Sequence, residues 1–210
     1  MSVNACNKNL SVAPPVTNTI AKATWQDLIN QIRLLEAENK SLREKVYSLE
    51  NQVRIDGLTK VETRDYGMTY LEMSLKNEQL TSLGLVFIDV DHLKIINDTE
   101  GHVVGDEVLS YVGSALTRVK KPSESISRFG GDEFLAVLPN ATHQEINVWC
   151  TQLHETLAKQ RLPFARPSLS ITVTTGNYVY NMKGDEKLTS KQLLSLVDLD
   201  MYQKKGARHR

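Results

Sequence analysis

Apolar side chains recur at alternating spacings of four and three residues over 24–55. This spacing is a heptad repeat, whose core positions are Leu28, Ile32, Leu35, Asn39, Leu42, Val46, Leu49 and Val53. One core position holds leucine throughout and the other holds mainly β-branched residues, a combination that favours two parallel strands. A single core asparagine fixes the register and the oligomeric state of such a pair. The pattern therefore predicts a parallel dimeric coiled-coil stalk, roughly 45 Å long at about 1.5 Å per residue.

The charged residues beside this core agree with a parallel pair. Glu38 of one chain can reach Arg43 of the other, and Lys45 can reach Glu50 in the same way. The alternative is a single amphipathic helix lying on its own domain, but such a helix usually shows a wider apolar stripe.

The pattern changes at Gly57, which interrupts the helix, and a head over 56–210 follows. Strand patterns cover 83–90, a hairpin over 125–138 and 168–180, and helical patterns cover 67–79, 92–98, 102–120, a segment through Ile146, Trp149, Leu153 and Leu157, and 190–205. Helices that alternate with single strands and one hairpin predict an α/β (α+β) fold that contains antiparallel pairs.

Composition limits the partners of this chain. It carries 25 basic and 25 acidic residues, so no long-range positive field favours nucleic acid or an anionic membrane. Cys6 and Cys150 lack metal-ligand spacing, which fits a reducing compartment. No apolar run approaches the roughly 20 residues that span a bilayer. Residues 1–23 look like a flexible polar tail without a signal peptide, and we expect a cytoplasmic protein.

Two acids follow two glycines in "RFGGDEF", residues 128–134. The glycines can supply the positive φ angles of a tight hairpin turn, and acids at its tip could simply keep it soluble. Asp89 ends the apolar strand 83–90, where a carboxylate needs a partner, and a metal ion is a natural one. If this strand lies beside the hairpin, Asp89 and Asp132 converge at one end of the sheet. Mg²⁺ is bound by one or two carboxylates together with substrate phosphates.

Asp91, His92 and Lys94 open the next helix, whose free N–H groups can cradle phosphate. For Asp91 alone, an ordinary N-cap is the favoured interpretation.

Four motifs carry a resemblance to a known family, namely "DGLT" at 56–59, "DVDHLKIINDTEGHVVGDEVL" at 89–109, "RFGGDEF" and "DLDMYQKK" at 198–205. In this order and spacing they resemble the GGDEF family of diguanylate cyclases over essentially the whole head. The resemblance implies a nucleotidyl-cyclase-like domain with a central, mainly antiparallel sheet flanked by helices. Members of the family join two GTP molecules into cyclic di-GMP and release two pyrophosphates.

The resemblance also implies a set of site residues. Asp89, Asp132 and the carbonyl of Val90 match the ligands of two Mg²⁺ ions, for which Mn²⁺ could substitute. Either Asp132 or Glu133 assists removal of the proton from the attacking 3′-hydroxyl, and the sequence does not decide between them.

For the nucleotide, the resemblance implies that Asn97 and Asp106 read guanine. The remaining substrate-binding residues that it implies are His92, Lys94, Leu109, Lys205 and Arg208. Without the motifs, Asn97 would be a helix C-cap and the charged residues would be solvated surface groups. Gly101 and Gly105 are expected to allow close packing against the nucleotide.

One head holds one GTP in this family, so two heads must face each other. A homodimer through 24–55 would raise the local concentration of the second head to about millimolar. A regulatory protein could act on the stalk. The alternative is a catalytically silent receptor of GTP or cyclic di-GMP that signals through its coiled coil.

Three stretches depart from the family pattern. The C-terminal "KKGARHR" differs from the usual AKxxGRN, so the second basic phosphate contact could be Arg208 or Arg210. The motif that begins the domain reads "DGLTKVETR", with Lys60 and Thr63 at unusual positions. The inhibitory RxxD motif reads "KPSE" from Lys121 to Glu124. Because lysine cannot reproduce the bidentate fork of arginine, product inhibition there should be weakened or absent.

Overall fold

The computed structural model describes residues 17–52, 54–159 and 170–208, and the chain divides into two compact units, Met1–Asn51 and Gln52–Arg210. Among the described residues, no helix combines the length and apolar character needed to cross a membrane.

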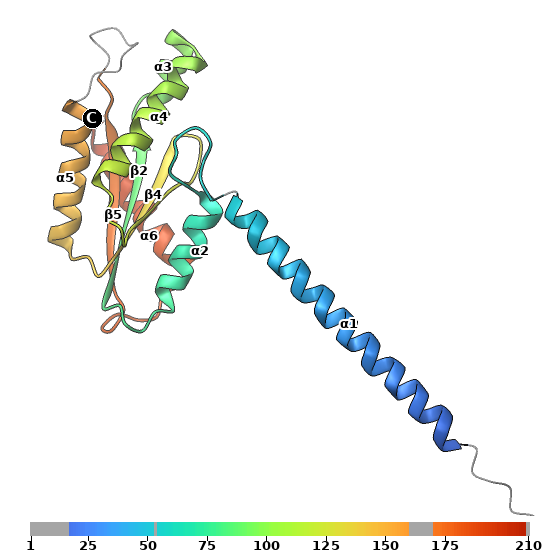
Figure 1. Cartoon of the computed structure of the whole chain (residues 1–210). Coiled ribbons are helices and arrows are strands. Elements are labelled where there is room, and N and C mark those ends of the chain that lie inside the picture. The colour runs from blue at the N-terminus through green and yellow to red at the C-terminus, as the bar shows by residue number, and fades with distance from the viewer. Residues whose placement is uncertain (1–16, 53, 160–169, 209–210) are drawn as a thin grey trace, which may run out of the picture. The chain divides into compact units, whose positions relative to one another are not determined.

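The first unit contains one helix of 36 residues, α1 (Thr17–Gln52), drawn in blue in Figure 1. It begins inside the segment that we predicted to be a tail, so the tail prediction is wrong for residues 17–23. The reason is that no glycine or proline lies between Pro15 and Gly57 to end the helix. Residues 1–16 of the predicted tail lie outside the described part of the chain.

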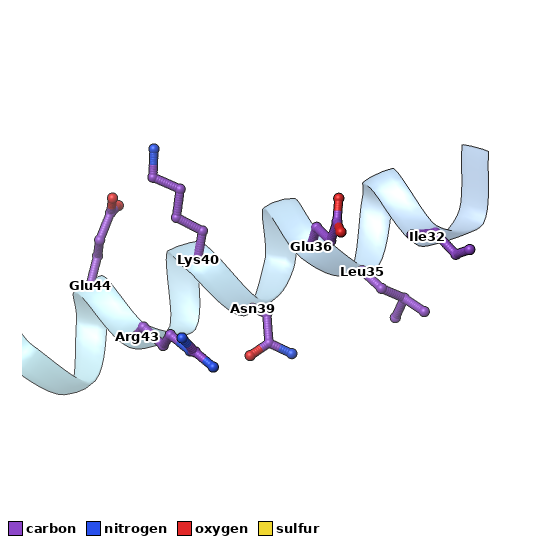
Figure 2. Close-up of a pocket in the computed structure, with 7 residues that line it drawn as sticks. All are labelled: Ile32, Leu35, Glu36, Asn39, Lys40, Arg43 and Glu44. Atoms are coloured by element: carbon purple, nitrogen blue, oxygen red, sulfur yellow. The ribbon is translucent and has the colours of Figure 1, made fainter. Parts of the chain in front are cut away.

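The heptad-core residues of α1 whose side chains are described are exposed, with Leu28 at 45%, Ile32 at 48%, Leu35 at 62% and Leu42 at 54%. Seven residues of this helix line a shallow hollow. In Figure 2, Leu35 and Asn39 point to one side of the helix and Lys40 and Glu44 point to the other. All seven lining residues come from one helix, so the hollow is a helix surface and not an enclosed ligand site. The side chains of Val46, Leu49, Glu50 and Val53 lie outside the described residues.

The second unit is built on a five-stranded sheet in the order β1-β3-β4-β2-β5. Its strands are β1 (Glu62–Thr63), β2 (Ser82–Val90), β3 (Ser125–Arg128), β4 (Glu133–Pro139) and β5 (Val173–Asn181). Only the short β1–β3 pair is parallel, and the other three pairs are antiparallel. The predicted central, mainly antiparallel sheet is therefore confirmed.

Helices cover both faces of this sheet (Figure 1). One face packs against α2 (Arg64–Leu75) and α6 (Ser190–Arg208), and the other packs against α3 (Leu93–Glu100), α4 (His102–Val119) and α5 (His143–Lys159). Successive side chains of a strand point to opposite faces, so a strand covered on both sides reads as a continuous apolar run. This explains why β2 contributes alternate residues to two separate cores.

The first helix of the head differs from its predicted range of 67–79. Helix α2 begins earlier, at Arg64, and ends at Leu75. It ends early because the side chain of Asn77 accepts a hydrogen bond from the N–H of Gln79 at 3.0 Å and stabilises a turn there.

A buried carboxylate ties the beginning of the head to its sheet. Glu62 is 3% exposed and accepts hydrogen bonds from Arg54 and Lys120, both at 3.1 Å, from the hydroxyl of Ser125 and from the N–H of Ile126. Burial raises the pKa of Glu62, but the hydrogen bonds from Ser125, Lys120 and Arg54 outweigh it, and the pKa lies below its usual value.

Replacing Glu62 with glutamine should lower the free energy of unfolding at pH 7 by about 2 kcal/mol, because buried donors lose a charged acceptor. A lowered carboxyl pKa stabilises the fold above the pKa of the unfolded chain, and this contribution is lost as the pH falls through the folded pKa. Urea unfolding across this pH range should therefore show the difference shrinking in acid. Glu72→Gln, at an exposed position of α2, is the matched control and should change nothing. Equal stability of Glu62→Gln and the unsubstituted chain at pH 7 would contradict this role.

Candidate active site

The hairpin that carries the "RFGGDEF" motif does not turn in the way that the sequence suggested. Neither Gly130 nor Gly131 has a φ in the left-handed region, so the expectation that these glycines supply positive φ angles is wrong. A β-carbon on Gly130 would lie 2.7 Å from Oε2 of Glu133, whereas one on Gly131 would meet nothing within 4 Å. The first glycine therefore makes room for the Glu133 side chain, and the second leaves open space beside the acids.

The acids of two strands meet at one end of the sheet. Asp89 lies opposite Glu133 in the β2–β4 register, and the N–H of Val90 donates to the carbonyl of Asp132 at 3.1 Å. The predicted convergence of Asp89 and Asp132 at this end is confirmed. Asp89 is 6% exposed, and its Oδ2 lies 2.6 Å from Nζ of Lys205 on α6.

Negative charge accumulates in this acid cluster of Asp89, Asp132 and Glu133. Burial raises the pKa of Asp89, Lys205 lowers it, and the charges of Asp132 and Asp91 raise it further, so that it lies above its usual value. The pKa of Glu133 is also raised, by burial first and then by nearby carboxylates, of which Asp132 has the largest influence. A cation placed among these groups would relieve their repulsion.

Among the described residues, no three His, Cys, Asp or Glu side chains form a complete metal site. The acid cluster nevertheless fits Mg²⁺, because this ion prefers oxygen ligands and is usually held by one or two carboxylates and the substrate's phosphates. Asp89, Asp132 and the carbonyl of Val90 would be its protein ligands.

Asp91 is not the N-cap residue of the following helix, so the N-cap interpretation is wrong. Its carboxylate accepts hydrogen bonds from the hydroxyls of Thr172 at 2.7 Å and Thr174 at 2.6 Å, which fastens the end of β2 to β5. His92 occupies the N-cap position instead, with φ 61°. The side chain of His92 makes no capping hydrogen bond to α3. Lys94 is exposed in its first turn.

The two residues predicted to read guanine lie on neighbouring helices. Asn97 is on α3 and the exposed Asp106 is on α4. A β-carbon on Gly105 would lie 1.8 Å from Oδ1 of Asn97, so Gly105 makes room for this side chain. Gly101 has φ 90° and joins the two helices.

The remaining predicted substrate-binding residues differ in burial and in their contacts. Leu109 is 5% exposed and belongs to the core, so its packing accounts for it more directly than contact with a ligand. Lys205 pairs with Asp89. Arg208 is the last residue of α6, and its side chain lies outside the described residues.

Sequence reasoning missed the residues that hold the loop containing Gly130 and Gly131 in place. The guanidinium of Arg128 donates to the carbonyls of Gly130 at 3.2 Å and Gly131 at 2.8 Å, and it pairs with Asp56 at 3.3 Å. Asp56 also accepts hydrogen bonds from the N–H and the hydroxyl of Thr59. The start of the head and this loop are thus joined by one side chain.

The KPSE turn is closed by its own acid. Glu124 is 6% exposed and accepts hydrogen bonds from the N–H of Lys121 at 2.8 Å and the indole of Trp149 at 3.2 Å. Its carboxylate is therefore turned into the fold.

The head is similar in sequence to known proteins. A family model described as "Diguanylate cyclase, GGDEF domain" matches residues 53–210. The chain is 32% identical over 158 residues to the probable diguanylate cyclase DgcC of Escherichia coli K12, covering 74% of this chain and 42% of that protein. It is 28% identical over 191 residues to the cyclic di-GMP phosphodiesterase NbdA of Pseudomonas aeruginosa, covering 88% of this chain and 24% of that protein. The chain thus spans less than half the length of these relatives.

The fold also resembles solved structures. The coiled coil and GGDEF domain of DgcB from Caulobacter crescentus, solved in complex with c-di-GMP, superposes with a TM-score of 0.69 at 25% sequence identity. The match covers 86% of this chain and 95% of that one.

Proposed function

Since the chain belongs to the GGDEF family of diguanylate cyclases, we propose that it condenses two GTP molecules into cyclic di-GMP and two pyrophosphates. The observation that supports this most is the register of β2 and β4, which brings Asp89 and Glu133 face to face with Asp132 beside them. A head that had lost its chemistry would be free to lose these acids, and this chain keeps them all.

We assign the two ends of the nucleotide to different parts of the head. Asp106 accepts from the N1–H and N2–H₂ groups of guanine, which adenine cannot offer as a pair, and Asn97 lies beside it. The first N–H groups of α3, together with Lys94 and His92, face the phosphates. Lys205 and Arg208 at the end of α6 supply further positive charge for the phosphates.

Asp89, the carbonyl of Val90 and Asp132 hold the Mg²⁺ ions in this proposal. The ions, when bound, neutralise charge at the α-phosphate and at the attacking and leaving oxygens. Asp132 or Glu133 accepts the proton of the attacking 3′-hydroxyl, since both belong to the acid cluster.

The second head comes from a second copy of the chain in this proposal. The exposed heptad-core residues of α1 would be covered in a parallel pair, and pairing would bring the two heads close to each other. A regulatory protein that binds the stalk could change how the heads meet.

The proposal is tested by incubating the full chain with GTP and Mg²⁺ and identifying the products by chromatography. We expect cyclic di-GMP with two pyrophosphates per product, none with ATP and none with a chelator. GTP binding without any product would overturn the proposal in favour of the silent receptor.

Product inhibition at the KPSE turn should be absent. The carboxylate of Glu124 is occupied by Lys121 and Trp149, and lysine lacks the fork that arginine offers a guanine. Added cyclic di-GMP should therefore leave the initial rate unchanged, as measured by pyrophosphate release. Saturable inhibition that Glu124→Gln removes would contradict this prediction.

A further inference from the structure

A lysine already lies at the carboxylate proposed to hold a metal ion. Lys205 is on α6, far along the chain from Asp89 at the end of β2, and the two form an ion pair at 2.6 Å. The Asp89 side chain is 8% exposed and that of Lys205 is 36% exposed. Because Asp89 is buried and the two residues come from different elements, the contact is more than a loose surface pair.

The neighbouring lysine shows what an ordinary pair on this helix looks like. Lys204 contacts Asp200 at 2.7 Å, one turn away on the same helix, and the two side chains are 43% and 33% exposed. This pair stays within α6, whereas Lys205 reaches a different element and the acid cluster. The two lysines therefore have the same chemistry and different surroundings.

The charge of Lys205 has a consequence for any divalent ion. Lys205 lowers the pKa of Asp89, whereas the charges of Asp132 and Asp91 raise it, so the ammonium offsets part of their repulsion. An ion that approaches Asp89 must displace this ammonium or bind next to a like charge. A triphosphate beside the site would give Lys205 a second acceptor and free Asp89 for the ion.

We propose that Lys205 acts as a counter-ion that occupies Asp89 until nucleotide arrives, so that divalent ions bind weakly to the nucleotide-free head and tightly with GTP. This inference rests on the proposed function, because it assigns a regulatory step to the same site. Coupling between two ligands is reciprocal, so the ion should strengthen GTP binding by the same factor. Lys205 is a positioning residue in this step, since it acts on the ion through Asp89.

The test measures binding of Mn²⁺ to the full, nucleotide-free chain, with free Mn²⁺ quantified by electron paramagnetic resonance. We expect Lys205→Met to bind Mn²⁺ about tenfold more tightly than the unsubstituted chain, equivalent to about 1.4 kcal/mol. Lys204→Met is the matched control and should not change the affinity. Lys205→Arg keeps a positive charge at Asp89 and should bind as weakly as the unsubstituted chain.

A merely structural role would weaken Mn²⁺ binding in Lys205→Met, so unchanged or weaker binding overturns the proposal. An equal gain in Lys204→Met overturns it too, because the effect would then be one of general charge. If Lys205→Met does not fold by circular dichroism, Lys205→Gln takes its place, since glutamine keeps a hydrogen-bond donor without the charge.

A second measurement repeats the Mn²⁺ titration with a non-hydrolysable GTP analogue. The ratio of affinities with and without the analogue should fall in Lys205→Met, and an unchanged ratio overturns the coupling. Neither titration needs product formation. A chain that makes no cyclic di-GMP would therefore contradict the proposed function, while the Mn²⁺ results would still decide the role of Lys205.

Discussion

Asp89→Asn should lower the rate of cyclic di-GMP formation by about a thousandfold, the scale seen when one strong electrostatic contact to a transition state is lost. Asparagine keeps the size and shape of the side chain but removes the charge that would hold Mg²⁺ next to Asp132. The proposed reaction separates pyrophosphate from the α-phosphate, so it depends on neutralising charge at that point. Product formation is measured by chromatography at saturating GTP and Mg²⁺.

The same substitution should leave the head folded and its melting temperature equal or higher. The pKa of Asp89 lies above its usual value, mainly because of burial, so the ionised side chain lowers the free energy of unfolding at neutral pH. A neutral asparagine does not carry this cost. Asp65→Asn, on the exposed first turn of α2, is the matched control and should leave both rate and melting temperature unchanged. Full activity in a folded Asp89→Asn protein would remove the basis for the acid cluster as the active site.

The order of the elements in the head could be predicted from the sequence because each apolar run has a clear period. The meeting of Asp89 and Asp132 could also be predicted, since it needs only one assumption, that strand 83–90 pairs with the hairpin. The register that places Asp89 opposite Glu133 confirms that assumption. The local apolar pattern and one assumed strand pairing were enough to predict that these two acids meet.

Contacts between distant segments could not be predicted in this way. Arg128 and Asp56 are 72 residues apart, and nothing in either neighbourhood shows that they meet. Lys205 looked like a phosphate contact, and its pairing with Asp89 depends on how α6 crosses the sheet. Asp91 was interpreted locally as a cap, while its hydroxyl partners lie on and beside β5. In each case a tertiary partner overrides the local preference of the residue.

The glycines show a different limit of sequence reasoning. Paired glycines before a turn suggest positive φ angles, but Gly130 has none. At Gly130 and Gly105, the side chains of Glu133 and Asn97 occupy the space that a β-carbon would take. A sequence shows that a glycine is present, and only the packing shows whether its backbone freedom or its lack of a side chain is used.

Leu35→Lys should make the protein monomeric and lower cyclic di-GMP formation at micromolar protein by on the order of a hundredfold, because the heads lose the roughly millimolar effective concentration of a linked pair. In the proposed coiled coil, Leu35 faces its counterpart in the heptad core, and two lysines there would repel each other and lose apolar burial. The oligomeric state is measured by analytical ultracentrifugation. GTP binding, measured by equilibrium dialysis, should stay intact because each head holds its own nucleotide.

The adjacent leucine provides the matched control. Leu34 is 70% exposed and Leu35 is 62% exposed, but only Leu35 belongs to the heptad core. Leu34→Lys should therefore remain dimeric and active, which separates loss of a heptad-core residue from loss of an exposed leucine. The rate per Leu35→Lys molecule should rise with protein concentration, since two free heads must then collide. A monomeric Leu35→Lys protein with full activity at every concentration would show that the two half-sites do not need the stalk.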